Sequence, residues 1–294
     1  MKNWVRAAAG VVVVAGMGFG LAACAPEPGD TVRQPPTTSE AVPTPAPTED
    51  AAETPSEPAA PKLEQAELDR RLRDAAWAND VSAAKQLIEW GADVNAVDDT
   101  VQSPYLIATS EGRLELLRLT LEHGANPEAL DSWDGTGLIR AAERGHWDIS
   151  GELIRAGVPV DHVNNLGYQA IHEAVWLGRD DPSYHATLRV LVAGGAAFDT
   201  LSVSEGLTPL QMADQRGFSG QYGILQTLTG TPLPAEPGPA LLAAAAAGDA
   251  DAVALALRAG AEPGTVDSDG VSALEIAEAA GSPLAAQVIR ALGG

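Results

Sequence analysis

The chain has 294 residues, with 40 acidic side chains against 18 lysines and arginines, and a net charge of −22 at pH 7. This balance lacks the basic footprint that nucleic acids and anionic lipid headgroups require, so neither is expected as a partner. The acidity either steers a basic protein partner toward the chain or only keeps the protein soluble. Cys24 is the single cysteine, which excludes intrachain disulfides and dithiol redox chemistry.

The first 23 residues have the pattern of an export signal. Lys2 and Arg6 precede an uncharged apolar run of 17 residues, 7–23, that ends in small side chains. A retained transmembrane helix is the alternative, but the run is short and rich in Gly and Ala. Leu21-Ala22-Ala23-Cys24 resembles the lipobox of bacterial lipoproteins, in which the cysteine is acylated and becomes the mature N-terminus. The resemblance implies a lipid anchor on Cys24 and a position at the extracytoplasmic face of the cell membrane or in a periplasm.

Residues 24–62 are predicted to be a disordered tether. Ten prolines lie between positions 26 and 61, among many Thr, Ser, Ala and Glu and with no aromatic residue. Such a composition cannot bury a core. A proline-rich chain extends by about 3.1 Å per residue, so the tether would reach on the order of 110 Å and hold a folded region away from the membrane.

From residue 63 onward the sequence repeats. The repeat is anchored at positions separated by 31 to 39 residues, most often 33, which are Arg70, Ser103, Thr136, Gln169, Thr208, Pro239 and Ser272. An apolar residue stands two positions after each anchor and an alanine five positions after it. Nine positions after each anchor stands Gly, or Asn79 in the first unit. Three columns in phase over more than 200 residues predict seven structural repeats.

Each unit has the signals of two short helices. Ser or Thr at the anchor can cap a helix N-terminus, Pro104 and Pro209 follow at the first helical position, and the glycine ends the helix. A second apolar segment ends at another stop, as in Leu121-Glu122-His123-Gly124-Ala125. Here the chain resembles the ankyrin repeat family, whose Thr-Pro-Leu-His-x-Ala pattern is most closely matched by Thr208-Pro209-Leu210-Gln211-Met212-Ala213. The resemblance implies an all-α solenoid of about seven helix-turn-helix units over residues 63–294.

Two places depart from the regular period. Residues 179–185 lengthen the fourth unit and are expected to extend the link between its helices. Residues 230–239 contain four prolines in place of the usual turn, so the stack either continues through a modified connection or bends into a second lobe. Because the period resumes in phase at Pro239, we expect continuation.

Residues that suggest catalysis or metal binding have structural explanations. His172 occupies the histidine position of the ankyrin pattern, where the resemblance implies hydrogen bonding between neighbouring turns. No second histidine lies at ligand spacing. Asp267-Ser268-Asp269-Gly270 begins like a calcium loop but lacks the final Glu, so we interpret it as a repeat turn. No nucleophile motif or phosphate loop is present. No cofactor, metal or enzymatic activity is therefore expected.

The resemblance also implies where a partner binds, because ankyrin proteins generally use turn tips and first-helix ends on the concave face. The corresponding positions here are Trp77, Asp99, Thr100, Gln102, Ser110, Glu111, Ser132, Trp133, Glu143, Arg144, Asn165, Leu166, Tyr168, Trp176, Leu177, Glu205, Gln215, Arg216 and Asp269. Among them, Trp133, Tyr168 and Trp176 form an expected cluster of exposed aromatics, since such residues dominate interface hot spots. The alternative is that they pack under the 179–185 insertion.

The sequence thus predicts a membrane-anchored, extracytoplasmic ankyrin repeat protein that acts as a protein-interaction scaffold. Two alternatives remain open at this point. One is a small-molecule receptor or enzyme with a pocket at His172, Glu173 and Trp176. The other is a purely structural spacer.

Overall fold

The computed structural model describes residues 63–294, which form an all-α solenoid of fourteen helices joined by turns. The predicted signal segment, Cys24 and the tether lie outside the described residues. The helices are α1 (Gln65–Ala78), α2 (Val81–Glu89), α3 (Pro104–Ser110), α4 (Leu114–Glu122), α5 (Gly137–Glu143), α6 (Trp147–Arg155), α7 (Ala170–Trp176), α8 (Pro182–Ala193), α9 (Pro209–Arg216), α10 (Ser219–Gly230), α11 (Pro237–Ala247), α12 (Ala250–Arg258), α13 (Ala273–Ala279) and α14 (Pro283–Ala291).

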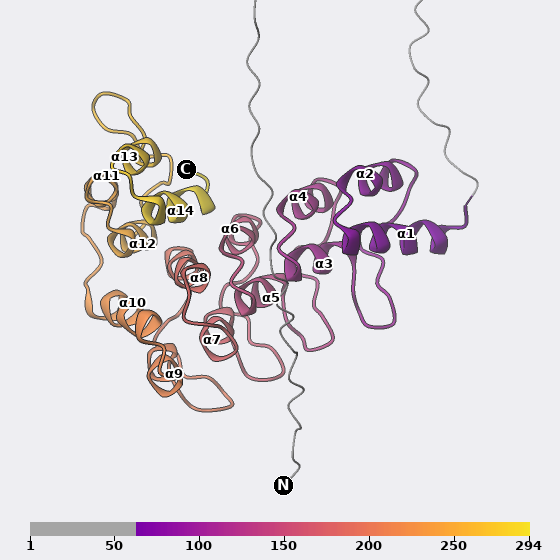
Figure 1. The fold of residues 1–294 in the computed structure, drawn as a ribbon, viewed down its shortest axis with the longest axis horizontal. Coiled ribbons are helices and arrows are strands. Elements are labelled where there is room, and N and C mark those ends of the chain that lie inside the picture. Colours follow the sequence, from indigo (N-terminus) through magenta and orange to yellow (C-terminus); the bar gives the residue numbers. More distant parts are fainter. Residues whose placement is uncertain (1–62) are drawn as a thin grey trace, which may run out of the picture. The chain divides into compact units, whose positions relative to one another are not determined.

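Consecutive helices pair into the seven predicted units. The inner helices α1, α3, α5, α7 and α9 lie in one row with the turns extending from their side, and the outer helices α2, α4, α6, α8 and α10 form a second row (Figure 1). The predicted alanine column is buried in every unit, from Ala75 to Ala277. Small alanines let neighbouring inner helices approach closely, so the units share one continuous core.

Capping residues define the inner helices as predicted. The hydroxyls of Ser103, Thr136, Thr208 and Ser272 each accept a hydrogen bond from the backbone N–H three residues later. At the other end, Asn79 and five of the six glycines adopt a left-handed backbone with φ between 55° and 73°. Gly178 is the exception. A Cβ there would lie 1.8 Å from the Ala174 carbonyl oxygen, so close packing rather than φ requires this glycine.

A side-chain oxygen at the start of each regular turn organises the loop between units. Asp98 Oδ1 accepts from the backbone N–H groups of Thr100 and Gln102, at 2.8 and 3.0 Å. Asp131, Asn164 and Asp267 make the same pair of bonds two and four residues onward. These bonds fix the turns as rigid projections from the inner helices. Asp267 belongs to such a turn, as predicted, and not to a calcium loop.

Two inner helices begin earlier than the sequence predicted. Helix α1 begins at Gln65 rather than after Arg70, and α11 begins at Pro237 rather than after Pro239. Neither Arg70 nor Pro239 has a side-chain oxygen that could cap a helix at that point. Without a cap or a preceding turn, each helix extends toward the N-terminus until Glu64 or Glu236.

The insertion at 179–185 mainly lengthens the second helix of its unit, and only its first residues lengthen the link. Helix α8 begins within the insertion at Pro182 and has 12 residues, whereas α4 and α6 have 9. Tyr184 from the insertion lies against Gly145 and Gly178, and its hydroxyl donates to the Glu143 carbonyl oxygen at 3.0 Å. The insertion therefore fills the junction of the third and fourth units. It does not act as a free loop.

The stack does not continue straight through residues 230–239, so the expectation of continuation was wrong. Helix α9 packs on α7, but α11 does not pack on α9 in the same way. Instead α12 packs against α8, and α14 packs against both α6 and α8 (Figure 1). Residues 231–236 supply no hairpin turn to hold the sixth unit in register with the fifth. Helices α11–α14 consequently form a C-terminal lobe that covers the outer helices of the third and fourth units.

The side chains between the lobe and the stack are closely packed. All residues of α8 from Ala186 to Ala193 are buried. In α6, a Cβ on Gly151 would lie 2.3 Å from the Ala291 carbonyl oxygen, so glycine permits the approach of α14. Arg189 Nε donates to Asp251 Oδ1 at 2.6 Å and links α8 to α12.

None of the helices between residues 63 and 294 is long and apolar enough to cross a bilayer.

Candidate functional site

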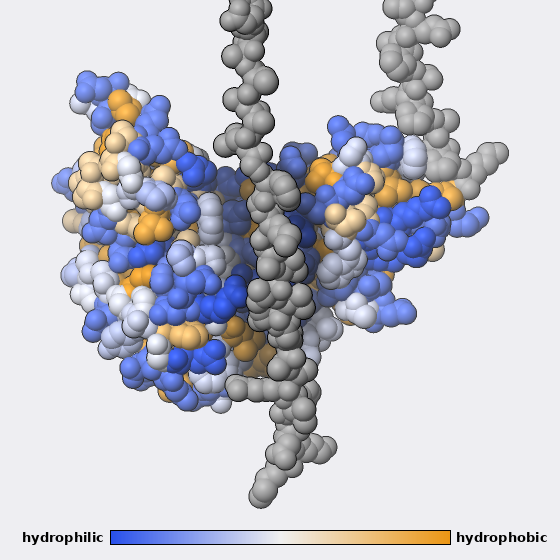
Figure 2. Space-filling view, in the orientation of Figure 1, coloured by the Kyte–Doolittle hydropathy of each residue, from blue (hydrophilic) through white to orange (hydrophobic). Residues whose placement is uncertain are grey.

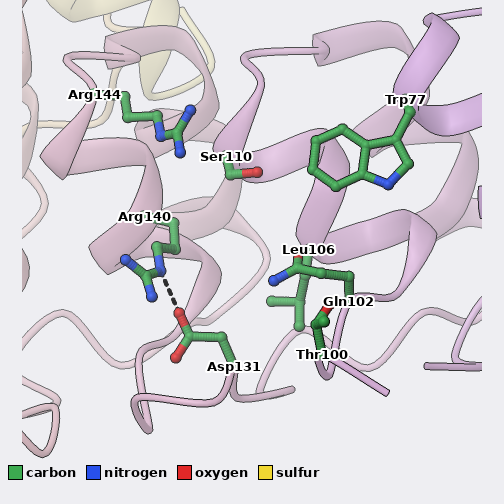
Figure 3. Close-up of a pocket in the computed structure, with 8 residues that line it drawn as sticks. All are labelled: Trp77, Thr100, Gln102, Leu106, Ser110, Asp131, Arg140 and Arg144. Atoms are coloured by element: carbon green, nitrogen blue, oxygen red, sulfur yellow. Dashed lines mark hydrogen bonds and ion pairs between the residues drawn. The ribbon is translucent and has the colours of Figure 1, made fainter. Parts of the chain in front are cut away.

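The concave side of the first three units contains a hollow of about 330 Å³. The hollow arises at the repeat position seven residues after the anchor. The second unit has the small Ser110 there, whereas the first and third units have the larger Trp77 and Glu143. The small serine leaves space beside the Trp77 ring. Figure 3 shows the residues that line the hollow, which are Trp77, Thr100, Gln102, Leu106, Ser110, Asp131, Arg140 and Arg144.

The base of the third turn forms one wall. Asp131 is buried, and its Oδ1 accepts from the backbone N–H groups of Trp133 and Gly135 at 2.7 and 2.8 Å. Its Oδ2 accepts from Arg140 Nε (Figure 3). Arg140 Nη1 donates to Glu143 at 2.7 Å. These two carboxylates raise the pKa of Arg140, so the guanidinium remains charged although it is half-buried.

Arg144 and Trp77 face each other across Ser110. Arg144 Nη1 donates to Glu111 Oε1 at 3.1 Å, and its guanidinium extends toward Ser110 (Figure 3). The Trp77 side chain is 49% exposed. Ser110 is buried and donates its hydroxyl to the Ile107 carbonyl oxygen at 3.2 Å. The hollow therefore has an aromatic wall, a cationic wall and a polar floor.

The predicted aromatic cluster is only partly present. Trp133 is 50% exposed at the tip of its turn, as expected. Tyr168 is only 6% exposed, so its place in the cluster was wrong. Its hydroxyl donates to Glu205 Oε1 at 2.5 Å, which ties the fourth turn to the fifth. The backbone N–H of Tyr168 donates to Asn164 Oδ1 and closes that turn, and its ring belongs to the core.

Trp176 is half-buried and forms part of a stack at the ends of α7 and α9. The Arg216 guanidinium lies 5.8 Å from the Trp176 ring centroid and 5.0 Å from that of Phe218. Arg216 and the neighbouring Gln215 are exposed, as predicted for this face. Both distances are within the range of cation–π attraction.

His172 and Glu173 do not form a reactive pair in the groove. His172 Nδ1 accepts from the Gln169 N–H at 3.3 Å, and its other ring nitrogen lies 3.0 Å from the Thr200 carbonyl oxygen of the next turn. Burial lowers the pKa of His172. Glu173 is buried, and Asn164 Nδ2 donates to its Oε1 at 2.7 Å. Burial raises the pKa of Glu173 to about 7. Neither residue lines the hollow.

The hollow brings together five of the predicted binding positions, Trp77, Thr100, Gln102, Ser110 and Arg144. Of the others, Asp99, Ser132 and Trp133 are exposed on turns, and Glu143 is half-buried in its pair with Arg140. Sequence reasoning missed Leu106, Asp131 and Arg140 as lining residues. Arg140 lies four positions after its anchor, one helical turn before Arg144, and that spacing could have identified it. Within residues 63–294, His, Asp and Glu side chains do not gather in any group that could hold a metal ion.

Comparison with known proteins gives several ankyrin repeat relatives. No protein-family profile matches the chain. The putative ankyrin repeat protein YahD of Escherichia coli is 33% identical over 138 residues, which are 47% of this chain and 68% of that protein. A transient receptor potential cation channel subfamily A member 1 homolog of Caenorhabditis elegans is 32% identical over 133 residues, which are 42% of this chain but only 10% of that protein.

Among solved structures, an ankyrin repeat domain from Acinetobacter baumannii is 44% identical and covers 53% of this chain and 79% of its own, with a TM-score of 0.49. Human ankyrin repeat domain-containing protein 63 is 30% identical over 96 residues, which are 25% of that protein. The similarity to YahD extends over two thirds of that protein. By this relationship, the chain belongs to the ankyrin repeat family.

Proposed function

We propose that this protein is a non-enzymatic scaffold that binds a protein partner through the concave face of its first five units. The observation that carries the proposal is the hollow beside Trp77, together with the exposed Trp133 and the Trp176–Arg216 stack on the same face. The turn that Asp131 fixes presents Trp133, and packed inner helices present Trp77, Trp176 and Arg216. The surface is therefore preformed, which lowers the ordering cost of association.

The partner's contacting surface is proposed to be basic. Residues 62–294 carry 33 acidic side chains against 15 lysines and arginines, a difference of −18. Hydrophilic residues dominate the face shown in Figure 2, and hydrophobic residues appear there in separate patches. A basic partner would be attracted before contact, and its association rate would fall with added salt.

We further propose that Cys24 carries the lipid anchor and that the repeat domain acts on the extracytoplasmic side of a bacterial membrane. The support is the sequence pattern of residues 1–24 alone. Replacement Cys24→Ser should move the full chain from the membrane fraction to the soluble fraction and abolish labelling by an alkyne fatty acid. Unchanged fractionation and labelling would contradict the anchor while leaving the binding proposal untouched.

The binding proposal is tested by crosslinking and pull-down of the tagged full chain from cells. The test variant combines Trp77→Ala, Trp133→Ala and Trp176→Ala. The matched control combines Leu233→Ala and Leu284→Ala, which truncate exposed apolar residues away from the face. We expect the wild type and the control to recover one protein that the test variant loses, with equal helicity by circular dichroism. Equal recovery by all three chains would instead favour a spacer role or another surface.

A further inference from the structure

We propose that the hollow between Trp77 and Arg144 binds the C-terminal residue of the partner chain. The terminal carboxylate would accept hydrogen bonds from Arg144, and the apolar side chain of that last residue would lie against the Trp77 ring. The inference rests on the proposed function and names the chemical group that the concave face recognises.

The first step is that the one acidic side chain lining the hollow is buried and already paired with Arg140. Both oxygens of Asp131 are occupied, Oδ1 by two backbone N–H groups and Oδ2 by Arg140. Asp131 is also only 5% exposed. A cationic group entering the hollow would find no free carboxylate among its lining residues. The hollow therefore differs from the acidic surface around it.

The second step is that the unused groups are mainly donors. Arg144 uses only Nη1, toward Glu111, so its Nε and Nη2 have no acceptor within residues 63–294. Arg140 uses Nε and Nη1 and retains Nη2. The Trp77 indole N–H likewise has no acceptor in the described part of the chain, and the Ser110 hydroxyl already donates to a carbonyl oxygen. A planar guanidinium with adjacent free N–H groups matches the two oxygens of a carboxylate.

The third step concerns what the carboxylate is attached to. The exposed Trp77 ring offers apolar surface on the opposite side of the hollow from Arg144 (Figure 3). A volume of about 330 Å³ is at the lower end of ligand pockets, which suits one residue rather than a long segment. A C-terminal residue places an apolar side chain and a carboxylate on the same carbon. An acidic side chain would leave the Trp77 ring uncovered.

The surrounding charge also favours a terminus. The acidic surface of the domain repels a segment that contains several carboxylates. The basic residues of such a segment are attracted to the acidic domain, and its terminal carboxylate accepts hydrogen bonds from the donors in the hollow. The proposal is thus a basic chain terminus with an apolar last residue.

The test uses fluorescence anisotropy with fluorescein-labelled peptides and the full chain at constant ionic strength. The probe is Gly-Lys-Gly-Lys-Gly-Phe with a free carboxylate, compared with its C-terminal amide and with an amidated Gly-Lys-Gly-Lys-Glu-Gly. We expect the free acid to bind at least tenfold more tightly than either amide. The replacement Arg144→Gln should remove this difference. Arg118→Gln should retain it, because Arg118 is similarly exposed and also pairs with a glutamate but lies on the outer helix α4, outside the hollow. Weak or absent binding of the free acid, equal binding of acid and amide, or a difference that survives Arg144→Gln would overturn the proposal.

A second variant tests the hollow independently of charge. Ser110→Leu should fill the space beside Trp77 and weaken binding of the free-acid peptide at least tenfold. Ala246→Leu should not, because Ala246 is an exposed residue of the same repeat column but lies in helix α11 of the C-terminal lobe. Tight binding to Ser110→Leu, or preference for the glutamate peptide, would contradict the assignment. If the aromatic variant loses its cellular partner but Arg144→Gln and Ser110→Leu do not, the scaffold function stands and this inference fails.

Discussion

In the first five units, each inner helix packs on the next inner helix and the outer helices α2 and α4 keep one side in solvent. The last two units use the same helix pair, yet α12 and α14 pack onto the outer helices α6 and α8. Five units therefore build an open concave face, whereas two units close part of the opposite face. The same type of helix pair therefore occurs both in the stack and in the C-terminal lobe.

The difference lies in what precedes and what receives each unit. Turns organised by Asp98, Asp131 and Asn164 precede the second, third and fourth units, and a turn closed by the Ser202 N–H and the Leu207 carbonyl oxygen precedes the fifth. These turns set the register of the stack. Residues 231–236 lack that turn, so the sixth unit is free to change direction. Helix α8 then receives it. Residues 186–193 are mostly apolar and all are buried, Thr187 and Arg189 included, whereas Glu115, Arg118 and Glu122 of α4 are exposed. A mostly apolar helix needs cover on more than one face.

The largest expected effect on the contact between the lobe and the stack comes from removing the ion pair that joins them. Replacement Arg189→Met leaves Asp251 beside α8 without its partner, and we expect unfolding to become easier by about 4 kcal/mol, because breaking a largely buried pair strands a charge. Urea unfolding followed by circular dichroism measures the loss.

The control for this prediction is Arg70→Met, which breaks exposed pairs with Glu67 and Asp74 and should cost less than about 1 kcal/mol. The double variant Arg189→Met with Asp251→Leu should recover most of the loss, since two apolar side chains replace the pair. A cost for Arg189→Met as small as that of the control would show that the lobe is held by other contacts.

A smaller change acts on the close approach of α14 to α6. Gly151→Ala places a Cβ 2.3 Å from the Ala291 carbonyl oxygen, and backbone cannot move aside without displacing α14. The free-energy cost of overpacking exceeds the gain from the higher helix propensity of alanine, so we expect the stability to fall by about 2 kcal/mol. Hydrogen exchange should speed up in α12 and α14 and remain unchanged in α3 and α5.

Gly223→Ala is the matched control, because a Cβ at that position in α10 meets nothing within 4 Å. There the propensity term acts alone and should stabilise the protein by up to about 1 kcal/mol. Faster exchange throughout the chain in Gly151→Ala would mean that the lobe and the stack unfold as one unit.

Much of the stack could be predicted from the sequence, because each repeat carries its own local signals. Thr136 caps a helix, Ala141 is buried and Gly145 ends the helix with φ of 73°, all as their column predicts. These effects act within one unit or between neighbours, so the period alone reveals them. The early start of α1 at Gln65 was missed because Arg70 fills the column without supplying a cap.

The lobe and the exact site could not be predicted in the same way. Contact between Gly151 and Ala291 joins residues 140 positions apart, and no column relates them. The mostly apolar sequence of α8 was a signal of cover on more than one face, but it does not say which helix provides the cover. Similarly, Tyr168 has the residue type of a binding hot spot, and only the position of Glu205 on the next turn shows that it is used internally.

Finally, the stack should respond to pH through the buried carboxyl group of Glu173. Burial raises the pKa of Glu173 from 4.5 to about 7. The folded protein therefore holds a proton that the unfolded chain has already lost, and stability is fully present below pH 4.5 and falls as pH rises through 7. In Glu173→Gln this loss disappears, although the new amide N–H lies where Oε2 has no partner among the described residues. We expect the variant to be more stable than the wild type by about 2 kcal/mol at pH 8 and no more stable at pH 4.5. Chemical denaturation of the wild type and the variant at both pH values measures the difference in stability. Burial lowers the pKa of His172, which has the opposite effect on stability, but both proteins contain His172, so its contribution cancels. An equal difference at both pH values would mean that Glu173 is ionised in the folded stack throughout, and that Asn164 and Arg140 offset its burial more fully than the geometry indicates.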